Sequence, residues 1–142
     1  QVLSVSIGFL KRDLLIMKLT KNLLFFALCC GLSAVPAMAS GDVAAGEKLF
    51  KRCKACHVVD AEKHKTGPHL VNIMGRTAGT VEGYKRYSKA MKASGVVWNE
   101  ETLDGYLEKP KAYVKGTRMA FAGLRKEADR ANVIAYLKSY SN

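Results

Sequence analysis

The pentapeptide CKACH, at residues 53–57, places two thiols and one imidazole within a single short stretch of the chain. Three kinds of chemistry use such a cluster: a redox-active dithiol, a zinc site, and covalent attachment of haem beside a histidine that can bind its iron. The choice among these three largely decides which function the sequence predicts.

A redox-active dithiol explains the cluster least well. A C-x-x-C motif of that type accompanies a βαβ pattern, and the sequence contains no strand run of convincing length. The dithiol interpretation also leaves the adjacent His57 without a role.

A zinc site would need further ligands, and two histidines, His64 and His69, follow the cysteines at a spacing found in zinc fingers. However, seven residues separate Cys56 from His64, whereas about 12 to 15 are usual between such pairs. In addition, Gly67 and Pro68 interrupt any helix that could carry both histidines. The spacing therefore disfavours zinc.

Covalent haem accounts for every residue of the motif. Two thiols one helical turn apart can add to the two vinyl groups of a porphyrin, and the thioethers then hold the neighbouring imidazole over the iron. The sequence thus favours one haem c, attached through Cys53 and Cys56, with His57 bound to the iron.

Whether a ligand fills the sixth coordination position of such an iron decides between two functions. A second axial ligand gives an electron-transfer site, whereas an open position gives chemistry with small molecules. The possible ligands are Met74, Met91, Met119, His64 and His69. Met74 and Met91 have apolar or helical surroundings typical of core methionines, but Met119 stands in the loop sequence VKGTRMAFAG, where no helical periodicity explains it.

Helices joined by long loops must position these residues. Asp42 can cap a helix whose apolar positions, at residues 43, 46, 49, 50 and 53, follow helical spacing and place CKACH at the C-terminal end. Further helices are predicted at 88–93, from the cap Asn99 to Pro110, and at 126–140.

Loops are predicted at 58–83, with one helical turn at 69–74, and at 111–124. A loop of about 25 residues is too long for an ordinary compact domain, so we expect a cofactor to organise it. The expected fold is all-α, a small single domain with long loops wrapped around one covalently bound haem.

The segment 17–39 has the layout of a cleaved signal peptide. Two lysines precede the apolar run 23–35, and Ala37-Met38-Ala39 matches an A-x-A cleavage site. The run is shorter than the roughly 20 residues of a membrane-spanning helix. We therefore expect export to the periplasm, no stable membrane anchor, and loss of the cysteines at 29 and 30 with the leader.

Residues 1–16 precede a plausible initiator methionine and are interpreted as an upstream translation artefact, which leaves 40–142 as one domain. The formal net charge of the chain is +11, and most of this excess lies after residue 39. A positive balance of this kind suits an acidic partner, a phosphate surface, or solubility alone. Basic and aromatic residues do not alternate over any long stretch, so no nucleic-acid partner is predicted.

From Gly41 to Tyr140 the chain resembles class I cytochrome c of the mitochondrial and alphaproteobacterial type. The matching segments, in order, are GDVAAGEKLFKRCKACH, KHKTGP, Gly75-Arg76, YLEKPKAYVKGTRMAFAG and RANVIAYLK. The resemblance implies the fold of that family, in which the N- and C-terminal helices cross. Gly46 and Phe50 would then pack on Tyr136 and Leu137.

The resemblance also implies a set of site residues. Cys53 and Cys56 match the thioether sites, His57 the proximal ligand and Met119 the distal ligand. Six further residues match positions around the haem. Pro68 matches a proline whose carbonyl accepts the ring N–H of the histidine, and Arg76, Tyr87 and Trp98 match residues that hold a propionate. Thr117 matches a residue near the inner propionate, and Tyr106 one beside the methionine. Phe121 matches the aromatic residue near the exposed haem edge.

Three features depart from the pattern of the family. Lys115 stands where mitochondrial proteins usually carry a proline, which would make the Met119 loop less stiff. His69 replaces the usual asparagine after TGP, and the segment GYKRYS at 83–88 is one residue longer than the common form.

The function implied is that of a monomeric one-electron carrier, not an enzyme. Such a carrier docks with acidic faces of its partners, which are respiratory-chain oxidases or reductases in the membrane, or periplasmic redox enzymes. The lysines expected to steer docking are Lys54, Lys65, Lys85, Lys111, Lys115 and Lys126. One competing hypothesis is an enzyme or gas sensor with an open iron, for which Lys115 is the only hint. The other is an interaction module anchored to a larger complex.

Overall fold

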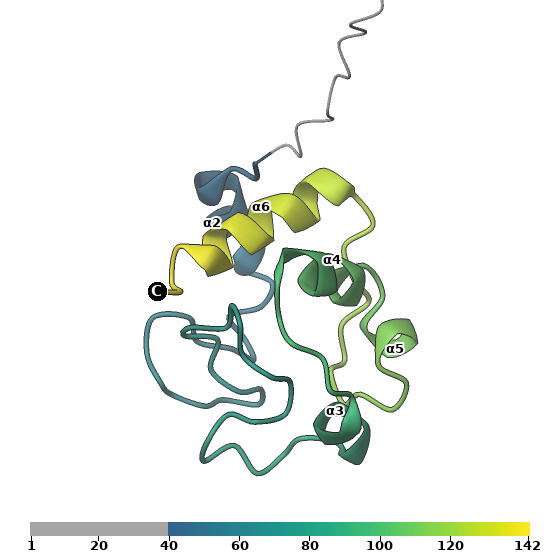
Figure 1. Cartoon of the computed structure of the whole chain (residues 1–142). Coiled ribbons are helices and arrows are strands. Elements are labelled where there is room, and N and C mark those ends of the chain that lie inside the picture. Colours follow the sequence, from purple (N-terminus) through teal and green to yellow (C-terminus); the bar gives the residue numbers. More distant parts are fainter. Residues whose placement is uncertain (1–39) are drawn as a thin grey trace, which may run out of the picture. The chain divides into compact units, whose positions relative to one another are not determined.

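The computed structural model describes residues 40–142, which fold into helices joined by long loops (Figure 1). The helices are α2 (Val43–Phe50), α3 (Lys89–Ala93), α4 (Glu100–Glu108), α5 (Pro110–Tyr113) and α6 (Glu127–Lys138). In these residues the only β pairing is an isolated bridge between Thr77 and Val97, so the all-α prediction is confirmed. None of the helices described is long and apolar enough to cross a membrane. The predictions made for residues 1–39, the upstream segment and the signal peptide, concern residues outside those that the structure describes.

Helix α2 begins at its predicted cap and leads into the CKACH motif. The side chain of Asp42 accepts a hydrogen bond of 2.8 Å from the backbone N–H of Ala45, as an N-cap residue does. After the last helical residue, turns continue the same winding, because Lys54 donates to the carbonyl of Phe50 and His57 to that of Cys53. The motif therefore lies at the C-terminal end of this helix, as predicted.

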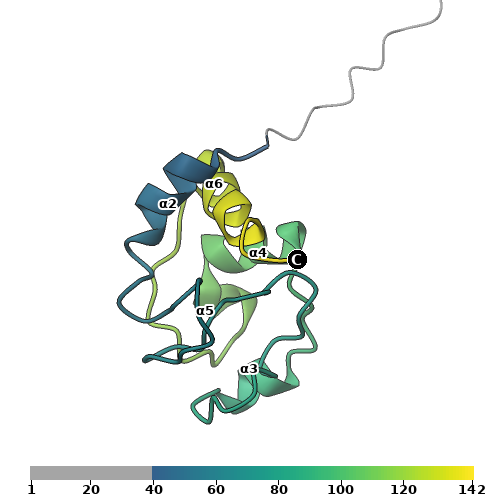
Figure 2. The ribbon, with the colours of Figure 1, turned by 90° about the vertical axis from the view of Figure 1, so that its left-hand side faces the viewer.

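Helices α2 and α6 cross in contact, which both views of the ribbon show (Figures 1 and 2). Gly46 lies at the crossing, where a Cβ atom would collide with the backbone oxygen of Asn132 and the Cβ atom of Tyr136. Glycine thus permits the close approach. The rings of Phe50 and Tyr136 pack beside it, with centroids 5.2 Å apart. The predicted packing of Gly46 and Phe50 on Tyr136 is confirmed.

The next two helices also begin at capping side chains, of which only Asn99 was predicted as a cap. Ser88 accepts from the backbone N–H of Met91 at the start of α3. At the start of α4, Asn99 accepts from the N–H of Thr102 at 2.8 Å, and the Thr102 hydroxyl accepts from the N–H of Asn99 at 2.9 Å. This reciprocal pair is a capping box, which satisfies two otherwise unpaired N–H groups.

Two local predictions were wrong. The loop predicted after Pro110 begins with the short helix α5, because a proline is well suited to the first turn of a helix and only keeps the preceding residue, Lys109, out of the helical conformation. The helical turn predicted at 69–74 is a series of non-helical turns. Asn72 has a φ of 52° there, which a right-handed helix does not allow.

The long loop before α3 is tied to the segment that precedes α4. Gly75 and Ala78 donate backbone hydrogen bonds of 2.7 Å to the carbonyls of Trp98 and Val96, and Trp98 donates to that of Arg76 at 2.9 Å. These bonds fix Arg76 and Trp98 next to each other in a region without helix or sheet. They bring two predicted site residues, separated widely in sequence, to one place.

Candidate functional site

A cavity of about 340 Å³ lies among the helices and loops. All the side chains predicted to hold the cofactor line it: Cys53, Cys56, His57, Pro68, Arg76, Tyr87, Trp98, Tyr106, Thr117, Met119 and Phe121. Apolar core residues, including Phe50, Leu103 and Val133, complete the wall. The tertiary structure therefore gathers residues from across the domain around one space.

The two cysteines occupy one side of the cavity as free thiols. Each is half-buried, and burial raises the pKa of the Cys53 thiol, while the Arg52 charge opposes this shift to a smaller extent. A hydrogen bond of 3.0 Å from the backbone N–H of Cys56 to the carbonyl of Cys53 holds them one turn apart. Both sulfur atoms are thus available to form bonds to a group inside the cavity.

His57 is oriented as a metal-binding imidazole would be. Its Nδ1 atom lies 2.7 Å from the carbonyl oxygen of Pro68, and because that oxygen can only accept, the proton is on Nδ1 and the lone pair on Nε2. Burial lowers the pKa of His57, against a smaller opposing effect of the Pro68 bond. A neutral imidazole with its Nδ1–H held by an acceptor is the form that binds metals.

Gly67 allows the chain to pass directly over the His57 ring. A Cβ atom at residue 67 would collide with three atoms of that imidazole. The backbone N–H of Gly67 donates to the carbonyl of Cys56 at 2.8 Å, so the segment is anchored to the motif itself. The ring is consequently confined between the turn that carries it and the segment 66–68.

Arg76 supplies a fixed positive charge at the cavity. Its Nη1 and Nη2 atoms donate to the carbonyls of Val71 and His69, at 2.9 and 3.1 Å. Neither of the ion pairs in the described residues includes it, and the cavity lining contains no aspartate or glutamate. Burial lowers the pKa of Arg76 and raises that of the neighbouring Tyr87. A partly buried cation without a carboxylate suits an anionic group.

A separate part of the cavity wall belongs to the segment between α5 and α6. The hydroxyl oxygens of Tyr106 and Thr117 are 3.1 Å apart and hydrogen-bonded. The Thr117 hydroxyl oxygen also accepts from the backbone N–H of Met119 at 3.3 Å. Burial raises the pKa of Tyr106, so its hydroxyl stays protonated in this pair. Met119, half-buried, thus has its backbone tied to α4 through Thr117.

Phe121 lies where the cavity approaches the surface. It lines the cavity and also a shallow surface hollow of about 440 Å³ formed by residues 109–112 and 120–122. The guanidinium of Arg52 stands 5.4 Å from the centre of its ring, within the range of a cation–π contact. The side chain therefore separates the interior from solvent.

Sequence reasoning missed several residues of the cavity wall. Arg52, Arg86, Arg118 and Ser88 line it, although none was predicted. All four are direct neighbours in sequence of residues that were predicted: Cys53, Tyr87 and Met119. For the three arginines, the signal available in the sequence was a positive charge directly beside a predicted site residue.

The two histidines considered as zinc ligands are used differently. The Nε2 atom of His64 bonds to the carbonyl oxygen of Glu82 at 2.9 Å, and its Nδ1 atom accepts from the N–H of His69 at 3.4 Å. The two rings stack with centroids 5.3 Å apart. Residues 40–142 contain no group of three or more side chains that could hold a metal ion by itself. The structure thus gives zinc no support.

The chemistry of the wall fits a covalently bound, anionic porphyrin. Two thiols stand ready for thioether bonds, a neutral imidazole offers its Nε2 atom, and an uncompensated arginine faces the same space. An all-α domain with such a cavity belongs to the c-type haem proteins.

Comparison with known proteins agrees with this class. The family model Cytochrome c matches residues 43–141. "Cytochrome c 2.1" of Caenorhabditis briggsae is 52% identical over 100 residues, which are 70% of this chain and 88% of the relative. "Cytochrome c2" of Rhodomicrobium vannielii is 52% identical over 102 residues, 71% of this chain and 81% of the relative.

A solved structure, cytochrome cH from Methylobacterium extorquens, superimposes with a TM-score of 0.66 and 44% sequence identity, covering 70% of this chain and 99% of the other. The chain therefore belongs to the cytochrome c family. It is a haem-based electron carrier with one haem c, attached covalently through Cys53 and Cys56. The predicted family, fold and cofactor are confirmed.

Proposed function

We propose that this protein is a soluble, monomeric one-electron carrier in which His57 and Met119 bind the haem iron from opposite sides. One observation carries the proposal: the two side chains line one cavity from separate segments, and the Nδ1–H of His57 is already engaged with Pro68. The bound haem c supplies a reversible change between Fe(III) and Fe(II). With both axial positions filled, no position is free for substrate, and the protein is not an enzyme.

The residues around the cavity keep this site dry and fixed. His57 holds its proton on Nδ1 against Pro68, so its Nε2 atom is always available as a ligand. Arg76, Tyr87 and Trp98 would hold a propionate of the haem, and Thr117 would lie near the inner propionate. Because the protein holds both ligands in place, reorganisation on electron transfer is small. Methionine ligation and burial favour the ferrous form and raise the reduction potential.

Docking uses the basic surface near Phe121. The lysines predicted to steer partners are all exposed: Lys54, Lys65, Lys85, Lys111, Lys115 and Lys126. Acidic faces of oxidases, reductases or other redox proteins in the periplasm are the complementary surfaces, and salt slows the encounter. Export by a cleaved leader at 17–39 brings the chain to that compartment.

Spectroscopy of the exported protein, combined with its intact mass, tests this function. We expect one haem per chain, a mass that begins near residue 40, and the weak red-edge absorption of an Fe(III)–thioether bond at neutral pH. A high-spin ferric spectrum that changes at once on adding peroxide or nitric oxide would instead identify an open iron, and would favour the enzyme or sensor hypothesis.

A further inference from the structure

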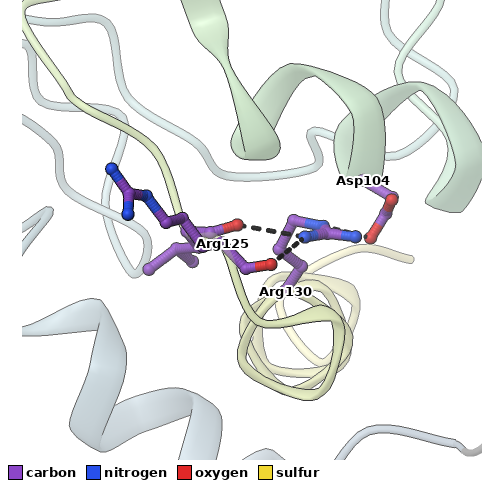
Figure 3. Close-up of polar contacts among 4 residues, drawn as sticks. Asp104, Arg125 and Arg130 are labelled. Carbon is purple, nitrogen blue, oxygen red and sulfur yellow. Dashed lines mark hydrogen bonds and ion pairs between the residues drawn. The ribbon is translucent and has the colours of Figure 1, made fainter.

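Arg130, near the start of α6, is a buried arginine that joins three parts of the chain. Its guanidinium group donates to Asp104 Oδ1 of α4 at 2.6 Å and to the carbonyl oxygens of Leu124 and Arg125 at 3.0 and 3.1 Å (Figure 3). The side chain is only 9% exposed. It therefore connects α6 both to α4 and to the end of the segment that carries Met119.

That segment has few bonds of its own. Within residues 118–123, no backbone N–H donates to a backbone oxygen. The segment is held upstream by the bond between Thr117 and Tyr106, and downstream by Leu124, whose N–H donates to the carbonyl of Leu107 at 2.8 Å. Two side-chain contacts add to these anchors: Arg118 Nη1 donates to the carbonyl of Arg86 at 3.4 Å, and Arg52 lies over the Phe121 ring. Because the backbone of the segment has no hydrogen bonds of its own to other backbone groups, the two anchors at its ends fix the course of the chain around Met119.

We propose that Arg130 is a positioning residue for Met119. By binding the Leu124 and Arg125 carbonyls, it fixes the downstream anchor and keeps the methionine sulfur inside the cavity. The inference rests on the proposed role of Met119 as the distal ligand.

An arginine suits this role because its planar group can donate in several directions at once. The Leu124 carbonyl belongs to a buried residue, and without Arg130 this oxygen loses a donor, which is unfavourable for a buried group. The hydrogen bond with Asp104 raises the pKa of Arg130. The group thus stays charged, and Asp104 aligns it.

A purely structural clamp between α4 and α6 is the alternative, and the chain offers a matched control. Lys138 and Glu100 join the same two helices through an exposed ion pair of 2.5 Å, at the end of α6 far from Arg130 in sequence. A second control is Ile134, which is buried on α6 but does not line the cavity. Its truncation lowers stability without removing a hydrogen bond to the Leu124 or Arg125 carbonyl.

The test uses the ferric holoprotein and two measurements. The first is the affinity for added imidazole, which competes for the sixth position of the iron. The second is the pH at which the Fe(III)–thioether absorption disappears. We expect Arg130→Gln to bind imidazole about tenfold more tightly, ~1.4 kcal/mol, and to lose the absorption at lower pH. Arg130→Lys should recover part of the difference. Ile134→Ala and Lys138→Gln should change the imidazole affinity by less than about twofold.

An Arg130→Gln protein whose imidazole affinity equals that of an Ile134→Ala protein of matched stability would overturn the positioning role. If Arg130→Gln does not fold, Asp104→Asn replaces it, with a smaller shift in the same direction expected and an unchanged affinity counting against the proposal. A wild-type spectrum without the thioether absorption would refute Met119 ligation and this inference together. An intact wild-type absorption with unchanged variants refutes the inference alone.

Discussion

The two sides of the haem cavity are built in different ways. The side that carries CKACH is local: hydrogen-bonded turns continue α2 through residue 57, and the segment 66–68 covers the imidazole. The Met119 side has no backbone hydrogen bonds within residues 118–123 and is held at its ends by side chains from α4 and α6. Of the two proposed ligands, His57 is therefore positioned mainly by its own neighbourhood in sequence, and Met119 by tertiary contacts.

This difference predicts which of the two proposed ligands leaves the iron first when the protein is destabilised. Breaking the CKACH side requires disruption of turns and of the packing around His57. The Met119 side can open when either anchor is weakened, because residues 118–123 have no backbone–backbone hydrogen bonds that would hold the segment in place. Exchange of the sixth ligand should therefore precede loss of the histidine when pH, temperature or denaturant is raised.

Removing the covalent attachment should have the largest effect, because it abolishes both sides at once. In the double variant Cys53→Ser, Cys56→Ser, an unfilled cavity of about 340 Å³ costs about 8 kcal/mol at ~24 cal/mol per Å³. This is comparable with the whole stability of a small domain. We expect little helical circular dichroism in the exported protein, and a native-like spectrum would contradict the cofactor's role as core.

Replacement of Met119 tests the weaker side directly. Met119→Ala should lower the reduction potential, abolish the thioether absorption and tighten imidazole binding by more than about tenfold. The matched control is Met74→Leu, because Met74 packs against the core without lining the cavity. The same titrations should leave this control like the wild type, and a Met119→Ala protein with the wild-type absorption would exclude Met119 as the ligand.

Gly67→Ala tests the side of the cavity that carries CKACH, where the segment 66–68 covers the His57 ring. The added methyl group meets the His57 ring, so we expect a loss of about 1–3 kcal/mol in the free energy of unfolding and a shifted reduction potential. Gly46→Ala, which disturbs the crossing of α2 and α6, should lower stability with little change in potential. Denaturant titration and voltammetry separate the two, and equal potentials for both variants would contradict the confinement of His57 by Gly67.

The smallest effect concerns pH. Burial, with smaller contributions from Arg76 and His64, lowers the pKa of His69 below its usual 6.5, and Glu62 acts weakly in the opposite direction. Below about pH 6.5 the unfolded chain therefore binds a proton that the native state does not, so stability falls as the pH is lowered.

Replacing this histidine by asparagine should flatten that dependence by less than about 1.4 kcal/mol per pH unit. Unfolding of His69→Asn and wild-type holoprotein, compared between pH 4 and 7, measures the difference. Parallel curves would show that His69 titrates normally in the native state.

The prediction from sequence succeeded where a signal is local or carried by a motif. Asp42 and Asn99 were identified as helix caps because a capping side chain and its partner lie only three residues apart. The start of α5 was missed because proline marks both the end of one helix and the first turn of another. Three other cavity arginines, Arg52, Arg86 and Arg118, were missed because no spacing rule describes residues that meet only in space.

The sequence by itself determined the attachment motif, the family and the helical class, since CKACH and its companion segments are read along one chain. Only the tertiary structure decided how the segment 118–123 is held. Its supports, Tyr106 and Arg130, come from two helices and act through hydrogen bonds between residues distant in sequence. Such bonds depend on how helices pack, and helix packing is a property of the folded domain as a whole.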